Sequence, residues 1–171
     1  MRYFALLTII FVLLGAVALG AQDDKPNFAG AWVLDADKSE QGGGGRGGRG
    51  RGTGASSKMN VGQKDDTLSV ETFRQNREGD EIAIVNVYTL DGKKSKNDSN
   101  FGTTESEAKW SKDGKILTIS SVTNISRGER DFTIETTAKW SLDKDVLTIE
   151  TTRSSMRGES TSKTVYNKKK K

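Results

Sequence analysis

The chain beyond residue 58 alternates apolar and polar positions with a period of two, interrupted by short turns that contain glycine. This alternation is typical of β-strands that turn one face to a core. No stretch beyond residue 58 keeps a helical period, and glycine marks turns at 78–80, 91–92, 113–114 and 157–158. The pattern therefore predicts strands near 30–34, 58–63, 66–75, 81–90, 93–99, 103–111, 115–125, 130–141, 145–154 and 159–167.

Strand 130–141 shows most clearly which side chains face inward. Its even-numbered positions from Phe132 to Trp140 are mostly apolar, whereas its odd-numbered positions are polar or charged. Because successive side chains of a strand point to opposite faces, the even set must face the interior. The same reasoning predicts further inward residues on other strands: Leu68, Val70, Thr72, Arg74, Thr104, Ser106, Ala108, Trp110, Leu117, Ile119, Ser121, Thr123, Leu147, Ile149, Thr151 and Arg153.

An internal repeat supports this interpretation. Residues 108–137 and 138–167 are identical at 11 positions, and a fainter copy begins at Leu68. Each unit reads as strand, tight turn, strand and turn, which predicts an antiparallel meander. About 8–10 strands of this kind either close into a barrel or leave long exposed edges, so we expect closure. The fold class predicted for 22–167 is a single all-β barrel domain.

Residues 1–21 have the pattern of a secretory signal peptide. Arg2 supplies a basic start, 3–19 are almost entirely apolar, and small residues precede Gln22. The apolar run of 17 residues is short for a membrane span of about 30 Å, so cleavage is favoured over an anchor. The prediction is a secreted or periplasmic protein without stable membrane insertion.

Composition sharpens the picture of the chain that remains. Only 39 of the 150 residues after Ala21 are apolar, while Ser and Thr together number 32. So few apolar residues suit a thin barrel with a partly polar interior. The chain has no Cys and no His. This excludes thiolate and imidazole catalysis, disulfides and His-ligated metal, and we predict no catalytic residue, metal site or cofactor.

Two basic segments lie outside the strand pattern. Residues 42–57 are rich in Gly and Arg with no apolar side chain larger than Ala, which predicts a flexible loop. Its arginines resemble those of RNA-binding segments, but no aromatic residue is interleaved with them, and we expect no nucleic-acid partner. The tail 168–171 is all lysine and is predicted to be a solvated end.

The segment from Asn27 to Leu34 contains a Gly30-x-Trp32 motif with Phe28 two residues before the glycine. It resembles the opening strand of the calycins, which include the lipocalins and the fatty-acid-binding proteins. Nearly the whole mature chain also resembles small secreted bacterial proteins, through the Asp35–Ser39 motif, the glycine-rich stretch, Trp110 and Trp140 at strand ends, and Thr164-Val165-Tyr166. The resemblance implies a lipocalin-like barrel whose Trp32, Trp110 and Trp140 are structural.

The resemblance also implies a ligand in the barrel lumen. Fatty-acid-binding proteins often hold a carboxylate with Arg-x-Tyr on the last strand, where this chain has Thr164-x-Tyr166. Arg74 and Arg153, which occupy equivalent places in the repeat, are candidates to replace that arginine. The candidate lumen residues are Arg74, Tyr88, Thr136, Arg153 and Tyr166.

The function favoured by these patterns is binding or carrying a small, partly apolar or amphipathic molecule, by a monomer outside the cytoplasm. A second hypothesis is an envelope protein-interaction or inhibitor module that uses the Gly/Arg loop or a sheet edge. A third is an enzyme that uses carboxylates with Tyr88, Tyr166 or arginine. No constellation of residues supports the third, so the prediction is a protein that is not an enzyme.

Overall fold

The computed structural model describes residues 25–40, 55–76, 78–99, 102–127, 130–156 and 158–170. No helix in these ranges is long and apolar enough to cross a membrane. The predicted signal peptide, 42–54 of the predicted loop and Lys171 lie outside the described residues. The strands are β1 (Gly30–Leu34), β2 (Lys58–Lys64), β3 (Thr67–Gln75), β4 (Glu81–Thr89), β5 (Lys94–Ser99), β6 (Gly102–Trp110), β7 (Ile116–Arg127), β8 (Arg130–Asp143), β9 (Val146–Ser155) and β10 (Gly158–Lys168).

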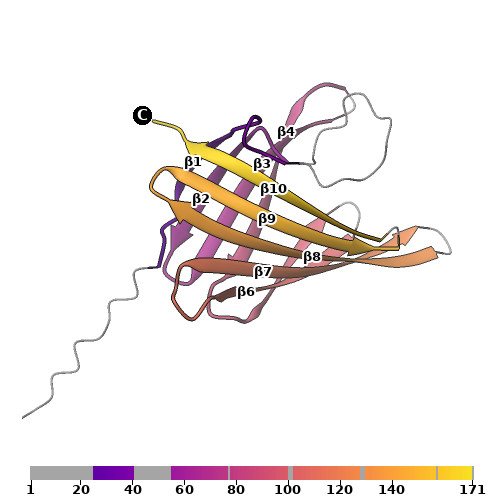
Figure 1. Ribbon diagram of the computed structural model, residues 1–171. Helices are drawn as coiled ribbons and strands as arrows, with labels where there is room; N and C mark the ends of the chain where they lie inside the picture. The colour runs from indigo at the N-terminus through magenta and orange to yellow at the C-terminus, as the bar shows by residue number, and fades with distance from the viewer. Residues whose placement is uncertain are drawn as a thin grey trace, which may run out of the picture.

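The ten strands form one antiparallel sheet that curls into a nearly closed barrel (Figure 1). Their order is β4-β3-β2-β1-β10-β9-β8-β7-β6-β5, so each strand except β4 is paired with the next in the chain, and β1 is also paired with β10. Strands β2–β4 lie behind β7–β10 in Figure 1 and form the opposite wall. The predicted all-β meander and its strand positions are confirmed.

The barrel is incompletely closed between β4 and β5, because these two strands end the sheet order and are not paired with each other. We call their junction the seam. Asn97 of β5 bridges this seam with its side chain. Its Oδ1 accepts a hydrogen bond from the Val87 backbone N–H at 2.8 Å, and its Nδ2 donates to the Val87 carbonyl at 3.0 Å. One side-chain amide thus stands in for a pair of ladder hydrogen bonds between the two edge strands.

Replacing Asn97 with alanine should loosen the seam without unfolding the barrel. The variant loses two neutral hydrogen bonds, so the free energy of unfolding should fall by about 1–2 kcal/mol. The more direct readout is faster hydrogen exchange at the Val87 amide. Asn60→Ala is the control, because Asn60 bonds to Glu71 across β2 and β3, which already share a backbone ladder. Similar exchange at Val87 in both variants would contradict the bridging role.

Four turns contain the glycines that the sequence predicts for them, and two further hairpins use non-glycine residues with positive φ. Gly79, Gly92, Gly114 and Gly158 all have positive φ, a conformation in which a side chain is strained. The hairpins from β2 to β3 and from β8 to β9 contain no glycine. There, Asp65 and Lys144 take the left-handed conformation, with φ of 50° and 54°.

The buried core fills one end of the barrel, which we call the core end. Its inward residues are those that the alternation predicts, with Leu68, Leu117 and Leu147 fully buried in equivalent places of the three repeat copies. Phe28, which precedes β1, completes this core with an exposed fraction of 0%. The opposite end, which β3 and β9 reach at Arg74 and Arg153, is called the polar end.

The side chain of Gln63 holds Phe28 at the core end. The amide of Gln63 accepts a hydrogen bond from the Phe28 backbone N–H at 2.9 Å and donates to the Pro26 carbonyl at 3.3 Å. The indole Nε1 of Trp32 donates to the Phe28 carbonyl at 2.9 Å. These three bonds fix the segment before β1 across the end of the barrel.

Candidate functional site

The barrel interior changes character along its length. At the core end the inward side chains are buried, with Phe28 stacked on Trp110 at 5.7 Å between ring centroids and edge-on to Trp140 at 5.6 Å. Toward the polar end most inward side chains, including Ser121, Thr136 and Thr151, are only half-buried. Water therefore reaches the inner face of the polar half, which makes this part of the interior the candidate binding site.

One wall of this site is lined by hydroxyl groups, and we call it the hydroxyl wall. A row of inward residues crosses six neighbouring strands from β5 to β10, each paired with the next: Ser95, Ser106, Ser121, Thr136, Arg153 and Ser160. Ser106 and Ser121 share a hydrogen bond of 2.8 Å. In the adjoining row, Thr104 and Thr123 share another of 2.8 Å. The polar band is therefore continuous along the inner sheet surface.

The facing wall, formed by β2–β4, mixes apolar and polar inward residues: Thr72 lies between Met59 and Ile84 in one register row, and Asn86 is paired with Val70 in the next. Met59, Val61 and Val70 are buried at its base. Ile84 pairs with Thr72 and is half-buried, and Ile82 pairs with Arg74 near the polar end with 44% of its surface exposed. A molecule in the polar half would thus meet hydroxyl groups on one side, and the hydrocarbon of Ile82 and Ile84 beside the polar Thr72 and Arg74 on the other.

Two of the predicted site residues are tyrosines at the base of this space. Tyr166 is buried, and its hydroxyl donates a hydrogen bond to the Ser56 carbonyl at 3.1 Å. Burial raises the pKa of Tyr166 to about 12. Tyr88 packs against the core beside Leu68, and burial raises its pKa as well. Both phenols therefore stay neutral at physiological pH, and that of Tyr166 is occupied by a protein partner.

The remaining predicted site residues lie nearer the polar end of the barrel. Thr136 and Arg153 are direct neighbours in the hydroxyl row. Arg74 lies on β3, in the opposite wall, and both arginine side chains are exposed. The structure thus brings Thr136 and Arg153 together, and places Arg74 on another wall toward the same end. The predicted structural tryptophans Trp32 and Trp140 are buried, and the partly exposed Trp110 packs against the core.

Several residues that position the site were not predicted from the sequence. Ser56, which the sequence places in the flexible loop, is buried, and its hydroxyl accepts a hydrogen bond from the Phe73 backbone N–H at 3.0 Å. Gln63 and Asn97 had no distinguishing signal beyond their polarity. Phe28 had one, because its spacing from Gly30 and Trp32 is part of the calycin-like opening.

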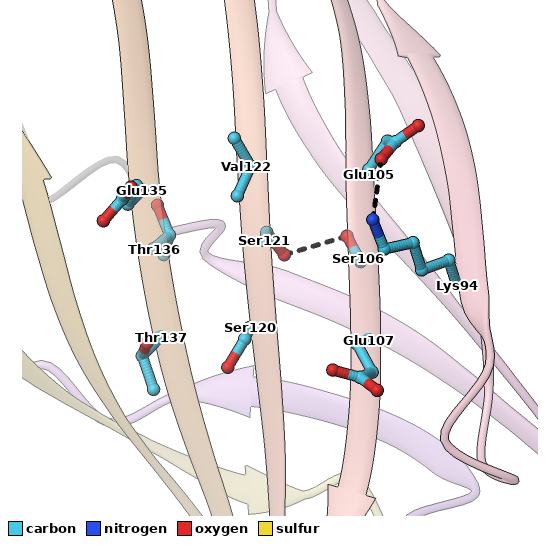
Figure 2. Close-up of a pocket in the computed structure, with 10 residues that line it drawn as sticks. All are labelled: Lys94, Glu105, Ser106, Glu107, Ser120, Ser121, Val122, Glu135, Thr136 and Thr137. Carbon is cyan, nitrogen blue, oxygen red and sulfur yellow. Dashed lines mark hydrogen bonds and ion pairs between the residues drawn. The ribbon is translucent and has the colours of Figure 1, made fainter.

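Two hollows are found at the barrel wall. One, of about 370 Å³, lies at β6–β8, and its lining contains both outward residues and the inward Ser106, Ser121 and Thr136 of the hydroxyl row (Figure 2). Lys96 and Lys94 lower the pKa of Glu105 by hydrogen bonding to it. The other, of about 230 Å³, lies over Ala31, Val33 and Phe73 near Lys58 and Lys169. The described residues form no group of Asp, Glu, His or Cys placed to hold a metal ion.

No protein-family model matches the chain, and no curated protein sequence matches it. Two solved structures share its fold. Zebrafish ileal bile acid-binding protein, complexed with cholic acid, superposes with a TM-score of 0.53 at 15% sequence identity. The match covers 83% of this chain and 98% of that one.

The second structure is a secretary abundant heat soluble (SAHS) protein from Ramazzottius varieornatus. Its TM-score is 0.51 at 12% identity, with 83% of this chain and 95% of the other covered. Both matches span almost the entire neighbour, so the whole barrel is shared rather than one hairpin. At these identities the likeness establishes a calycin-type barrel fold and nothing more specific.

Proposed function

We propose that this protein is an exported, non-enzymatic binding protein whose barrel takes a small, partly apolar molecule into its polar half. The observation that carries the proposal is the half-buried inner face above the packed core. Inward side chains such as Thr136 and Thr151 belong to a laddered sheet yet remain partly accessible to water. Concave space with an apolar base and a few polar groups is the usual form of a small-molecule site.

The fold and its neighbours support this proposal. The zebrafish protein holds cholic acid and has the same barrel architecture as this chain. Ile82, Ile84 and the buried aromatic base supply hydrocarbon contact, while the exposed Arg74 and Arg153 are suited to a charged or polar group at the polar end. Export rests on the signal-peptide pattern of residues 1–21.

Filling the interior provides the test of this function. Thr151 points inward and Thr152 outward on β9, so Thr151→Phe fills the candidate site while Thr152→Phe adds the same ring to the outer surface. Fluorescence titration with 1-anilinonaphthalene-8-sulfonate and with palmitate should give saturable binding to the unmodified protein. Thr151→Phe should weaken binding by about tenfold or more through crowding of the site.

The matched variant decides between an interior site and a surface site. Thr152→Phe should keep the affinity of the unmodified protein, and circular dichroism should show that both variants retain the β-sheet. Equal weakening by the two substitutions, or no binding of either probe at millimolar concentration, would contradict the proposed function.

A protein-interaction module is the second candidate, and strand β4 is the observation that favours it. Val85 on its outer face is 55% exposed, and Val87 and Ile82 are also exposed. β4 ends the sheet order, and the described part of the chain gives it no lysine or proline of the kind that protects edge strands. A pull-down that Val85→Lys abolishes and Thr151→Phe leaves intact would favour this alternative.

A further inference from the structure

The outer surface of the barrel differs in charge from one wall to the other. On β5 and β6 the outward positions carry Lys94, Lys96, Glu105, Glu107 and Lys109, which form ion pairs with one another. On β1–β4, three neighbouring outward rows contain six apolar residues: Ala31, Val33, Phe73, Ala83, Val85 and Val87. We call the outer surface at these three rows the weakly charged face.

The weakly charged face exposes hydrocarbon while its own charges are paired. Three valines on it are exposed, with exposed fractions of 55% for Val85, 45% for Val33 and 42% for Val87. The charged residues in its rows are Lys58, whose Nζ lies 2.7 Å from Oε1 of Glu81, and Glu71, which accepts a hydrogen bond from Asn60 at 2.7 Å. Contiguous exposed apolar side chains of this kind are typical of a contact surface.

The basic C-terminal tail begins at the edge of this face and is fixed there. The backbone N–H of Lys169 donates a hydrogen bond to the Ala31 carbonyl at 2.8 Å. The side chains of Lys169 and Lys170 are exposed. Lys169 also lines the hollow of about 230 Å³, together with Val33 and Phe73. An anionic group at this edge would therefore meet ammonium groups and hydrocarbon side by side.

The size of the face favours a lipid surface over a protein partner. Three rows on four strands cover about 400 Å² at the usual strand and residue spacings. A standard protein interface buries about 800 Å² on each partner, so a second copy or another folded protein would find too little surface here. A bilayer needs less apolar contact when lysines add to it, because each lysine near an anionic leaflet strengthens binding about fivefold.

We propose that the weakly charged face and the tail lysines form a docking surface for an anionic lipid bilayer. Val33, Val85 and Val87 contact the boundary between headgroups and acyl chains, while Lys169 and Lys170 contact the lipid phosphates. Docking is peripheral and reversible, and it gives a binding role to a tail that the sequence alone predicts as a solvated end. The docking surface is independent of the proposed ligand-binding function, because it lies outside the barrel wall and the candidate site lies inside.

Co-sedimentation with vesicles tests the docking surface. The chain from Gln22 onward contains every described residue and lacks the apolar segment 3–19, which would bind lipid by itself. Vesicles of phosphatidylcholine with about 30% phosphatidylglycerol should bind this chain about tenfold more tightly than pure phosphatidylcholine, and added salt should weaken the binding. Absence of binding to the anionic vesicles would overturn the proposal and leave the ligand-binding function untouched.

Two pairs of exposed apolar residues provide matched variants for the face. Val85→Gln with Val87→Gln removes two apolar side chains from β4. Ile116→Gln with Val122→Gln removes two from β7, on the opposite wall, where their exposed fractions are 38% and 40%. The β4 pair should weaken binding to the anionic vesicles about tenfold, and the β7 pair should change it less than about twofold. Circular dichroism should show the β-sheet in both.

Two pairs of lysines separate a fixed basic edge from general electrostatic attraction. Lys169→Gln with Lys170→Gln should weaken binding about twentyfold at low ionic strength. Lys112→Gln with Lys139→Gln removes the same charge from the β6–β7 turn and from β8, and should weaken it less than about threefold. Equal weakening by the matched pairs would overturn the proposal. Weakening by the tail lysines with none by the β4 valines would also overturn it, because a basic tail alone would then account for the binding.

Discussion

Phe28→Ala is expected to lower the free energy of unfolding by about 3–5 kcal/mol, the range for removing a buried aromatic ring from a packed core. The ring is 0% exposed and contacts two of the three tryptophans, stacked on Trp110 and edge-on to Trp140. Domains of this size are stable by only about 5–15 kcal/mol, so one residue outside the strands decides much of the stability. Urea denaturation followed by tryptophan fluorescence measures the loss.

Phe73→Ala is the matched control for this prediction. Phe73 lies on the outer face of β3 with the ammonium of Lys58 over its ring at 4.6 Å from the centroid. Removing it gives up part of its apolar burial and one exposed cation–π contact, about 1 kcal/mol in total. If both variants lose the same stability, Phe28 does not hold the core end together.

Local alternation explains why so much of the fold could be predicted. Whether Leu117 or Thr118 faces the core is decided by the period of the strand itself, and both the repeat and the glycine turns depend on neighbouring residues only. The inward orientation of Leu68, Leu117 and Leu147 can therefore be predicted without any contact between strands, and all three are buried. Closure of the barrel followed from the number of strands and the cost of open edges.

Interactions between distant segments set the limit of that prediction. Asn97 has the same alternation as its neighbours, and its bridging role appears only when β5 is brought against β4 by closure of the sheet. The role of Gln63 is likewise visible only in the folded barrel, where residues 26–28 cross the core end and its side-chain amide bonds to them. No local pattern contains either fact.

Candidate site residues were harder to predict for the same reason. An inward position can face either space or another segment, and alternation does not distinguish the two. Tyr166 and Thr136 both point inward, yet the tyrosine hydroxyl meets the Ser56 carbonyl while Thr136 lies on the half-buried polar face. Ser56 follows a stretch without apolar side chains, so its burial had no signal in the sequence.

Tyr166 also makes stability fall at high pH, with a transition that begins near the ordinary tyrosine pKa. In the unfolded chain its phenol loses its proton around pH 10, whereas burial in the folded barrel raises that pKa to about 12. Between these values the unfolded state releases a proton that the folded state retains, so rising pH favours unfolding. The stabilising contribution is complete below pH 10 and declines by about 1.4 kcal/mol for each pH unit up to 12.

Urea denaturation at pH 8 to 12 tests this dependence, and Tyr166→Phe isolates its source. The variant should lose about 1 kcal/mol at pH 8, because the hydrogen bond to Ser56 is gone. Its stability should then fall less between pH 10 and 12 than that of the unmodified protein, by about 2–3 kcal/mol. Tyr88→Phe removes the other phenol whose pKa burial raises, and its smaller effect separates the two residues. An identical decline in Tyr166→Phe and the unmodified protein would show that the buried phenol of Tyr166 is not the group whose titration lowers the stability.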